Sequence, residues 1–296
     1  GTVGGSLINQ ILSSQAKILE KKHLHLKIFA IAGAMQVILN KDGIKEDWKT
    51  QFEGQRTSKN ITKDIIQFSQ DNQLENLLVI DNTSSTDFVE NYNTYVENGF
   101  DLISSNKIAN TQSYSTYKEL RESLYNHRKE YLYETNVGAG LPIIDTIKVL
   151  HESGENITRI KGVFSGSLSF LFNSFSQSDL PFSDFLKIAV AEGYTEPDPR
   201  EDFARKLLIL ARELDLENEL ADVAVESLIP SALQELSTDK FLEDLEALDA
   251  HFSEVKDSLA PDEVLRYIGD LSGDLQQSKG KLEAKLVKVK TNSMLG

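Results

Sequence analysis

The stretch YTEPDPRED, at residues 194–202, gathers four carboxylates between two helical patterns of the 296-residue chain. An ordinary connection between helices needs only a few polar residues. Pro197 and Pro199 stiffen this segment, so Glu196 and Asp202 would be presented on a rigid backbone. Carboxylates held in this way are suited to bind a cation such as the ammonium of an amino acid. A solvated loop of helix-capping acids is the alternative.

Lys206 lies in the helical pattern FARKLLILAREL that follows the acidic loop. Phe203, Ile209 and Leu210 are three or four positions away, so they share a helix face with it. A lysine within an apolar stripe either extends along its margin or pairs with a carboxylate, for which the acids of the preceding loop are candidates. Loop and lysine together predict a zwitterion pocket in which the lysine donates a proton to a carbonyl oxygen. A purely structural salt bridge is the alternative.

The chain opens on GTVGG, in which Gly1 and Gly4 are followed by a helical pattern. Glycines let the backbone approach a pyrophosphate closely, and the N-terminus of a helix supplies N–H groups and the positive end of its dipole. This favours a nucleotide-binding turn, although an ordinary loop-to-helix turn has the same local pattern.

Strands that alternate with helices must position these residues in the first half of the chain. The expected strands lie in HLKIFAIAG, NLLVIDNTSS, FDLISSNK and EYLYETNVGAG, with helices in TDFVENYNTYVENG and STYKELRESLYNHRK between them. This order predicts βαβ units and a mainly parallel, doubly wound sheet. Ligands bind beyond the carboxyl ends of such strands. Thr83–Ser85, Asn106–Lys107 and Asn136–Gly140 follow three strands, so we expect these three polar tips at one crevice.

The second half has a different pattern. Helices in LPIIDTIKVLHESG and on both sides of the acidic loop precede ADVAVESLIP, VLRYIGDLSG and KLEAKLVKVKT, which alternate like strands with one solvent face. This predicts an α+β layout in which helices cover a mainly antiparallel sheet. We therefore divide the chain into residues 1–140, which bind the dinucleotide, and residues 141–296, which bind substrate, carry catalysis and dimerise.

The composition excludes several classes of protein. A formal charge of −15 argues against general binding to nucleic acid or to an anionic membrane. No apolar run approaches the roughly 20 residues that span a bilayer, and no signal-peptide pattern opens the chain. Cysteine is absent, which removes thiolate chemistry and is in keeping with a reducing compartment. We expect a cytoplasmic protein whose ligands are small molecules.

The assembled motifs resemble those of homoserine dehydrogenase, and most of all the dehydrogenase half of the bifunctional aspartokinase/homoserine dehydrogenases. The matching stretches are GTVGGSL, DNTSS, SNKIAN, NVGAGLP, GVFSGSLSFLFN, GYTEPDPRED and ARKLLILARE. The resemblance implies a Rossmann-type domain, a homodimer or higher homo-oligomer, and interconversion of L-homoserine and L-aspartate 4-semialdehyde with NADP or NAD, on the route to threonine and methionine. It also implies a piece of a longer enzyme, shortened at both ends.

The resemblance assigns roles to particular residues. Lys206 matches the proton-transfer lysine, and Lys107 matches a second lysine at the reaction centre that also contacts cofactor. Glu196 matches a substrate-binding acid, as does Asp202, although the short REDFARK stretch lets Asp202 match either of two family acids. The other implied cofactor contacts are Gly1, Thr2, Val3, Gly4, Thr83 and Ser84. The implied monovalent-cation (Na⁺) loop consists of Glu134, Val137, Ala139 and Leu141, acting largely through main-chain oxygens; the alternative is a plain glycine turn.

The choice between NAD and NADP stays open in the sequence. An NAD site usually has an acid after its second strand, and an NADP site has a basic residue there. Residues 32–36, AGAMQ, contain neither, and Met35 stands where relatives often carry a basic residue. Two other functions remain possible at this point: a dehydrogenase of another small amino acid, and an inactive cofactor-binding or oligomerisation fragment.

Overall fold

The computed structural model describes residues 1–54, 58–193, 199–229 and 245–296. These form two compact units. The first comprises Gly1–Ala109 and Ser115–Tyr133, and the second comprises Asn110–Tyr114 and Glu134–Gly296. The sequence analysis placed a single division after residue 140, whereas here the chain passes between the units three times. None of the helices within the described ranges is long and apolar enough to cross a bilayer.

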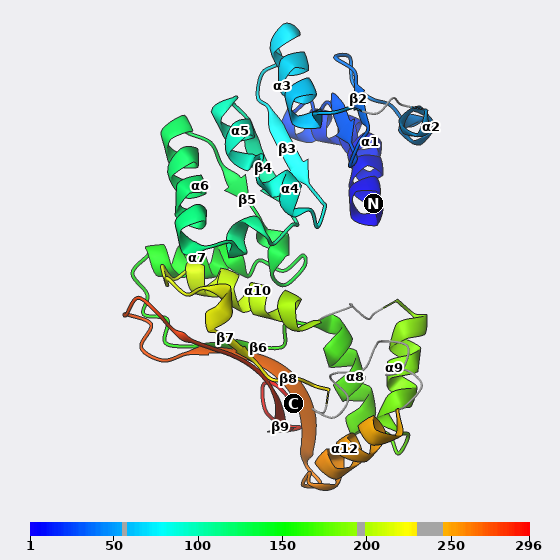
Figure 1. Cartoon of the computed structure of the whole chain (residues 1–296), viewed down its shortest axis with the longest axis vertical. Helices are drawn as coiled ribbons and strands as arrows, with labels where there is room; N and C mark the ends of the chain where they lie inside the picture. Colours follow the sequence, from blue (N-terminus) through cyan, green and yellow to red (C-terminus); the bar gives the residue numbers. More distant parts are fainter. Residues whose placement is uncertain (55–57, 194–198, 230–244) are drawn as a thin grey trace. The chain divides into compact units, whose positions relative to one another are not determined.

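A parallel sheet forms the centre of the first unit. Its strands are β3 (Leu78–Asp81), β4 (Asp101–Ser104) and β5 (Tyr131–Leu132), in the order β3-β4-β5. Both pairs are parallel, with Leu78 opposite Asp101 and Leu102 opposite Tyr131. The crossovers contain α4 (Thr86–Val89), α5 (Tyr92–Glu97) and α6 (Tyr114–His127), as Figure 1 shows. The predicted α/β class with a parallel sheet is therefore confirmed.

The strand expected in HLKIFAIAG is shorter than predicted and pairs differently. It is β1 (Ala30–Ala32), which pairs antiparallel with β2 (Val37–Leu39) in a separate two-stranded sheet. The cause is a tight reversal in which the Gly33 amide donates to the Gln36 carbonyl at 2.9 Å. A turn this short cannot hold the crossover that a parallel pair requires. The long helix α1 (Thr2–Lys22) packs on this hairpin through Leu12, Ile31 and Ile38.

Two further helices complete the first unit. They are α2 (Trp48–Glu53) and α3 (Ile61–Asp71). Trp48 joins the core beneath α1, and its indole N–H donates to the Asn9 side chain at 2.9 Å. Ile65 and Ile66 of α3 join a second core with residues of α5 and β4.

The second unit contains a mainly antiparallel sheet, as predicted. Its strands are β6 (Ile160–Gly162), β7 (Val223–Val225), β8 (Glu263–Ser272) and β9 (Lys281–Lys290), in the order β6-β8-β9-β7. The β6–β8 and β8–β9 pairs are antiparallel and the β7–β9 pair is parallel. The long strands β8 and β9 appear in orange and red in Figure 1.

Helices cover this sheet. The second unit contains α7 (Ile144–Glu152), α8 (Gly166–Ser176), α9 (Phe182–Ala191), α10 (Pro199–Arg212) and α12 (Glu246–Asp257), with short 3₁₀ turns η1 (Ala109–Thr111), η2 (Glu134–Asn136) and η3 (Leu220–Asp222). Helix α8 packs on β8, and α10 packs on β7, β8 and β9. Phe203, Leu207 and Leu210 of α10 are fully buried, which fixes the face that α10 turns to the core.

Candidate active site

A buried carboxylate organises the carboxyl ends of β3 and β4. Asp81, 3% exposed, is the last residue of β3. One of its oxygens accepts from the Thr83 amide at 2.7 Å; the other accepts from the Tyr92 hydroxyl at 2.7 Å and the Asn106 side-chain amide at 3.1 Å. A buried carboxylate is tolerated only when such donors replace its water. Burial raises the pKa of the Tyr92 hydroxyl, an effect that Tyr131 and Asp81 reinforce, so this group remains a donor.

The same network holds the loop that contains Lys107. The Asn106 side chain donates to the Ser85 carbonyl at 3.1 Å and accepts from the Ile108 amide at 3.0 Å. The Ser104 hydroxyl accepts from the Asn106 amide at 2.8 Å. The backbone is therefore fixed on both sides of Lys107. Two of the three predicted strand-end tips meet here; the third, Asn136–Gly140, falls in the second unit.

The glycine turn at the start of α1 lies at the same end of the parallel sheet. Gly1 is the N-cap of α1, and the Gly5 amide donates to the Gly1 carbonyl at 3.0 Å. A β-carbon added to Gly4 would lie 3.8 Å from the β-carbon of Asn82, the residue directly after β3. Glycine thus lets the first turn of α1 approach the strand end closely.

This arrangement fits a dinucleotide. The N–H groups of a helix's first turn have no acceptor within the helix, and the dipole of the 21-residue α1 adds positive potential there. Thr2, Val3, Thr83 and Ser84 are exposed around it. Backbone donors, small hydroxyls and a close backbone approach are the groups that a pyrophosphate needs.

The Lys206 side chain, in the second unit, is 16% exposed and directed by two bonds. Its ammonium donates to the Phe164 carbonyl at 2.9 Å and lies 2.5 Å from the carboxylate of Asp202. Phe203 and Ile209 on the same helix are buried, so the predicted placement of Lys206 in an apolar stripe is confirmed. Within the described residues these two partners use two of the three N–H groups of the ammonium.

The predicted acids of the YTEPDPRED loop are only partly placed. Asp202 is in the first turn of α10 and pairs with Lys206, one of the partners that the sequence suggested. Glu196 lies outside the described residues, and its role as a substrate-binding acid stays a prediction. Lys107 belongs to the first unit and Lys206 to the second, so their expected meeting in one cleft also stays a prediction.

The predicted cation loop has an ordered backbone and a capping carboxylate. Glu134 accepts from the Ile144 amide at 2.8 Å and the Asp145 amide at 2.9 Å, so it caps the N-terminus of α7. The Leu141 amide donates to the Gly138 carbonyl at 3.0 Å. Ala139 has a positive φ of 53°, and Val137 is fully buried. Convergence of the carbonyls of Val137, Ala139 and Leu141 stays a prediction.

Sequence reasoning missed two polar networks. One is the Asp81–Tyr92–Asn106 network, whose only sequence signal is an acid that directly follows the apolar run LLVI. The other joins Arg212 to the backbone of residues 110–112 and to Glu219. An arginine inside an amphipathic helix was its signal, but two of its partners, the Asn110 and Gln112 carbonyls, are 102 and 100 residues away along the chain.

The first unit is a parallel α/β unit with a glycine turn beside its strand ends, and the second is an α+β unit that holds a largely buried lysine–aspartate pair. This combination is typical of the class of dinucleotide-dependent oxidoreductases. Two family models match the chain, "Homoserine dehydrogenase, NAD binding domain" over residues 1–134 and "Homoserine dehydrogenase" over residues 142–296. The chain belongs to the homoserine dehydrogenase family.

Individual relatives agree with this assignment. The bifunctional aspartokinase/homoserine dehydrogenase of Buchnera aphidicola is 38% identical over 100% of this chain and 36% of its own length. The homoserine dehydrogenase of Saccharomyces cerevisiae is 34% identical over 91% of this chain and 77% of its own length. The solved structure of a putative homoserine dehydrogenase from Archaeoglobus fulgidus has a TM-score of 0.73 at 19% identity, covering 100% of this chain and 83% of the other. The chain thus spans about a third of the bifunctional relative's length.

Proposed function

We propose that this chain catalyses the reversible, NAD(P)-dependent interconversion of L-homoserine and L-aspartate 4-semialdehyde, within threonine and methionine biosynthesis. Family membership supports the reaction class. The observation that carries the proposal is Lys206, an ammonium held by Asp202 and the Phe164 carbonyl, whose third N–H has no partner among the residues that the structure describes. Reduction of an aldehyde creates an alkoxide, and an ammonium directed at that oxygen is a suitable proton donor.

Each predicted residue then has a defined task. Bound NAD(P)H supplies the hydride, and the chain supplies orientation and the proton. Lys206 donates to the forming alkoxide, and the ion pair with Asp202 holds the direction of the lysine side chain. Lys107 contacts the substrate and cofactor from the strand-end loop of the first unit. Glu196 binds the substrate ammonium, which its carboxylate charge favours.

The proposed cofactor site contains Gly1, Thr2, Val3, Gly4, Thr83, Ser84 and Lys107. Exposed Met35, in the turn after β1, lies in the stretch that distinguishes the two cofactors. Because residues 32–36 include no basic side chain, we propose that discrimination against NAD is weak. The ratio of kcat/KM values for NADP⁺ and NAD⁺ tests this point.

The proposed Na⁺ site is formed by Glu134, Val137, Ala139 and Leu141. Main-chain oxygens and a single carboxylate suit a hard cation of low charge. The Glu134 carboxylate already accepts hydrogen bonds from two backbone amides of α7. Its main contribution would therefore be to stabilise the loop, and its contribution to binding the ion would be smaller. Thermal unfolding in NaCl and in tetramethylammonium chloride of equal ionic strength separates specific binding from a general salt effect.

A homodimer and a cytoplasmic location are also part of the proposal. Ile188 and Val190 of α9 are nearly half exposed, and such apolar side chains are candidates for coverage by a second copy. Light scattering after size-exclusion chromatography tests the assembly, and fractionation of the source cells tests the location.

The central experiment follows reduced nicotinamide by its absorbance. The chain is incubated with L-homoserine and NADP⁺ or NAD⁺, and separately with L-aspartate 4-semialdehyde and the reduced cofactor. Turnover in both directions that requires the four-carbon substrate is expected. Equal turnover with five-carbon amino alcohols would point instead to a dehydrogenase of another small amino acid. Cofactor binding without turnover of any of these substrates would contradict the proposed activity.

A further inference from the structure

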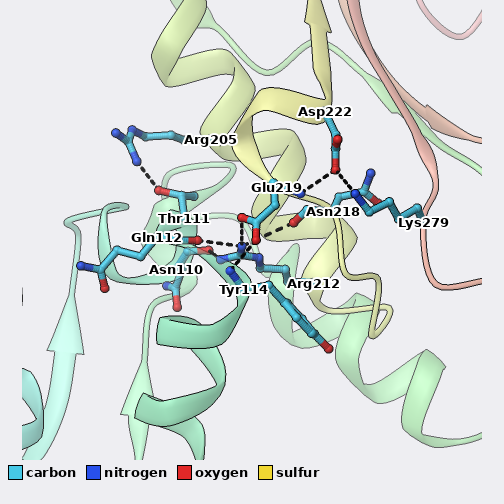
Figure 2. A network of polar contacts seen from close by, with 10 residues as sticks. All are labelled: Asn110, Thr111, Gln112, Tyr114, Arg205, Arg212, Asn218, Glu219, Asp222 and Lys279. Carbon is cyan, nitrogen blue, oxygen red and sulfur yellow. Dashed lines mark hydrogen bonds and ion pairs between the residues drawn. The ribbon is translucent and has the colours of Figure 1, made fainter.

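Arg212, at the end of α10, holds a short segment of backbone. Its side chain is 1% exposed. One terminal nitrogen of the guanidinium donates to the Asn110 carbonyl at 2.8 Å, and the other donates to the Gln112 carbonyl at 2.8 Å and lies 3.5 Å from the Glu219 carboxylate. Figure 2 shows the guanidinium between segment 110–114 and Glu219. Arginine suits this task because its planar fork can serve several acceptors at once.

The segment is held from other sides as well. The Tyr114 amide donates to the other oxygen of Glu219 at 2.8 Å, and Arg205 donates to the Thr111 hydroxyl. Glu219 is itself fixed by a capping box with Asp222. These bonds lie within the second unit, although the segment is flanked in sequence on both sides by residues of the first. The segment is therefore anchored at both of its ends.

All three passages of the chain between the units lead to this cluster. Two of them flank segment 110–114, at Ala109–Asn110 and Tyr114–Ser115. The third is at Tyr133–Glu134, where η2 begins. The side-chain amide of Asn110 donates to the side-chain oxygen of Asn136 in η2 at 3.0 Å. One polar cluster of the second unit thus contacts the chain at each of these three passages.

The same helix carries the proposed proton donor. Arg205 and Arg212 are seven residues apart, so they lie on one face of α10 and both reach the segment. Lys206 is adjacent to Arg205 and lies about 100° further around the helix. The rotation and axial position of α10 against the segment therefore set the direction of Lys206.

We propose that Arg212 is a positioning residue for the reaction, which anchors the chain passages to the helix that carries Lys206. The inference rests on the proposed function. Loss of the anchor would change the rotation of α10 and with it the direction of Lys206, while the proposed cofactor site of the first unit stays intact. Arg212 would consequently contribute to kcat and not to cofactor affinity. If Arg212 only stabilised the second unit, its replacement would lower the free energy of unfolding without separating the effect on kcat from the effect on cofactor affinity.

The test compares Arg212→Lys and Arg212→Gln with the full, unmodified chain. For both variants we expect kcat with homoserine to fall on the order of 10- to 100-fold, because small misplacements of reacting groups have effects of that size. The Kd for NADPH, from fluorescence titration, should stay within about twofold, and Arg212→Lys should retain more activity than Arg212→Gln because the charge remains. Lys290→Gln is the control, since Lys290 is well exposed and pairs with Asp262, which takes no part in this cluster.

Amide hydrogen exchange provides a readout that needs no activity. Faster exchange at Tyr114 and η2 in the Arg212 variants, with unchanged exchange in β8 and β9, is expected. If Arg212→Gln does not fold, Thr111→Val removes the hydroxyl of the segment to which Arg205 donates and should shift kcat and exchange in the same directions to a smaller extent. Unchanged kcat and exchange in folded variants would overturn the inference, as would a parallel loss of kcat, cofactor affinity and exchange protection throughout the chain. A wild-type chain without homoserine turnover would refute the proposed function and not the anchoring, which exchange measures independently.

Discussion

The ammonium of Lys206 lies 2.5 Å from the carboxylate of Asp202, one turn earlier on the same helix. An acid four residues before a lysine is the favourable order for an ion pair on a helix. Both side chains are largely buried, so water screens the pair less than it would at the surface. The pair restricts the direction in which the ammonium of Lys206 can point. This geometry is the basis of the first two predictions.

Replacing Lys206 with alanine should lower kcat by about 10²- to 10⁴-fold, the usual range for loss of a general acid. The Kd for cofactor should stay nearly unchanged. Lys206→Arg should fail as well, because arginine keeps its proton. Lys187→Ala, which removes an exposed lysine paired with Asp184 on α9, is the matched control. Steady-state kinetics and fluorescence titration measure the two quantities. Full activity in Lys206→Ala would leave the lysine as a salt-bridge partner only.

Neutralising the two acids should separate their roles. Glu196→Gln should raise the KM for homoserine while kcat changes little, because it removes the charge that attracts the substrate ammonium. Asp202→Asn should lower kcat more than it raises KM, because it releases the ammonium of Lys206. Initial rates over a range of homoserine concentrations distinguish the patterns. A rise in KM alone for Asp202→Asn would assign this residue to substrate binding instead.

Much of the fold followed from periodicity in the sequence. The antiparallel pairing of β8 with β9, the apolar residues of α10 and the parallel pairing of β3 with β4 all agree with the prediction. The predicted solvent face was wrong for β8, in which residues 264–271 are all buried, so alternation along the sequence did not reveal that both faces of this strand are covered. The β1–β2 hairpin was missed because a short apolar run does not reveal its partner or its direction, and the turn at Gly33 decided both.

The contacts of the site could be predicted only where both partners lie in the same short stretch of sequence. Lys206 and its partner Asp202 lie within one helical turn, so the sequence could suggest the pair. The Asp81 network joins residues that are 11 and 25 positions apart, and Arg212 reaches the Asn110 carbonyl 102 positions away. Such contacts depend on tertiary placement, about which local residue types say nothing.

Removing one hydroxyl should test the support beneath the cofactor loops. Tyr92→Phe deletes the donor to Asp81 and the contact with Ser104 at 3.0 Å, which leaves a buried carboxylate short of a partner. The free energy of unfolding should fall by roughly 1–3 kcal/mol, and the KM for cofactor should rise. Urea unfolding and initial rates measure both effects. Tyr125→Phe is the control, because Tyr125 is exposed. Equal stability of the two variants would contradict the importance of the network.

The ion pair between Asp270 and Arg159 should make the free energy of unfolding depend on pH in the acidic range. Arg159 donates to both oxygens of this buried carboxylate, at 2.8 and 2.5 Å, and these bonds hold the pKa of Asp270 below its ordinary value, while burial opposes the shift. A lowered pKa in the folded state stabilises the protein above the unfolded value of about 3.9, and this contribution is lost as pH falls through the folded pKa.

Asp270→Asn should therefore be less stable than the wild type at pH 7, and the difference should shrink below about pH 4. Urea unfolding at pH 7, 4 and 3 measures it. Asp179→Asn removes a fully exposed carboxylate 3.9 Å from Lys256 and should show little difference at any of these values. A difference for Asp270→Asn that stayed constant with pH would show that charge is not its source.

Gly269 of β8 leaves a space that the ring of Phe164 fills. A β-carbon at position 269 would stand 2.5 Å from that ring and 2.9 Å from Leu207, whereas a β-carbon at Gly162, its partner on β6, would meet Phe164 at 3.7 Å, an ordinary contact. Phe164 also supplies the carbonyl that holds Lys206. Under the proposed function, selection of random mutants for growth without threonine and methionine should thus accept alanine at 162 and reject every residue but glycine at 269. A glycine within a fully buried stretch of β8 would be as intolerant of change as the lysine itself.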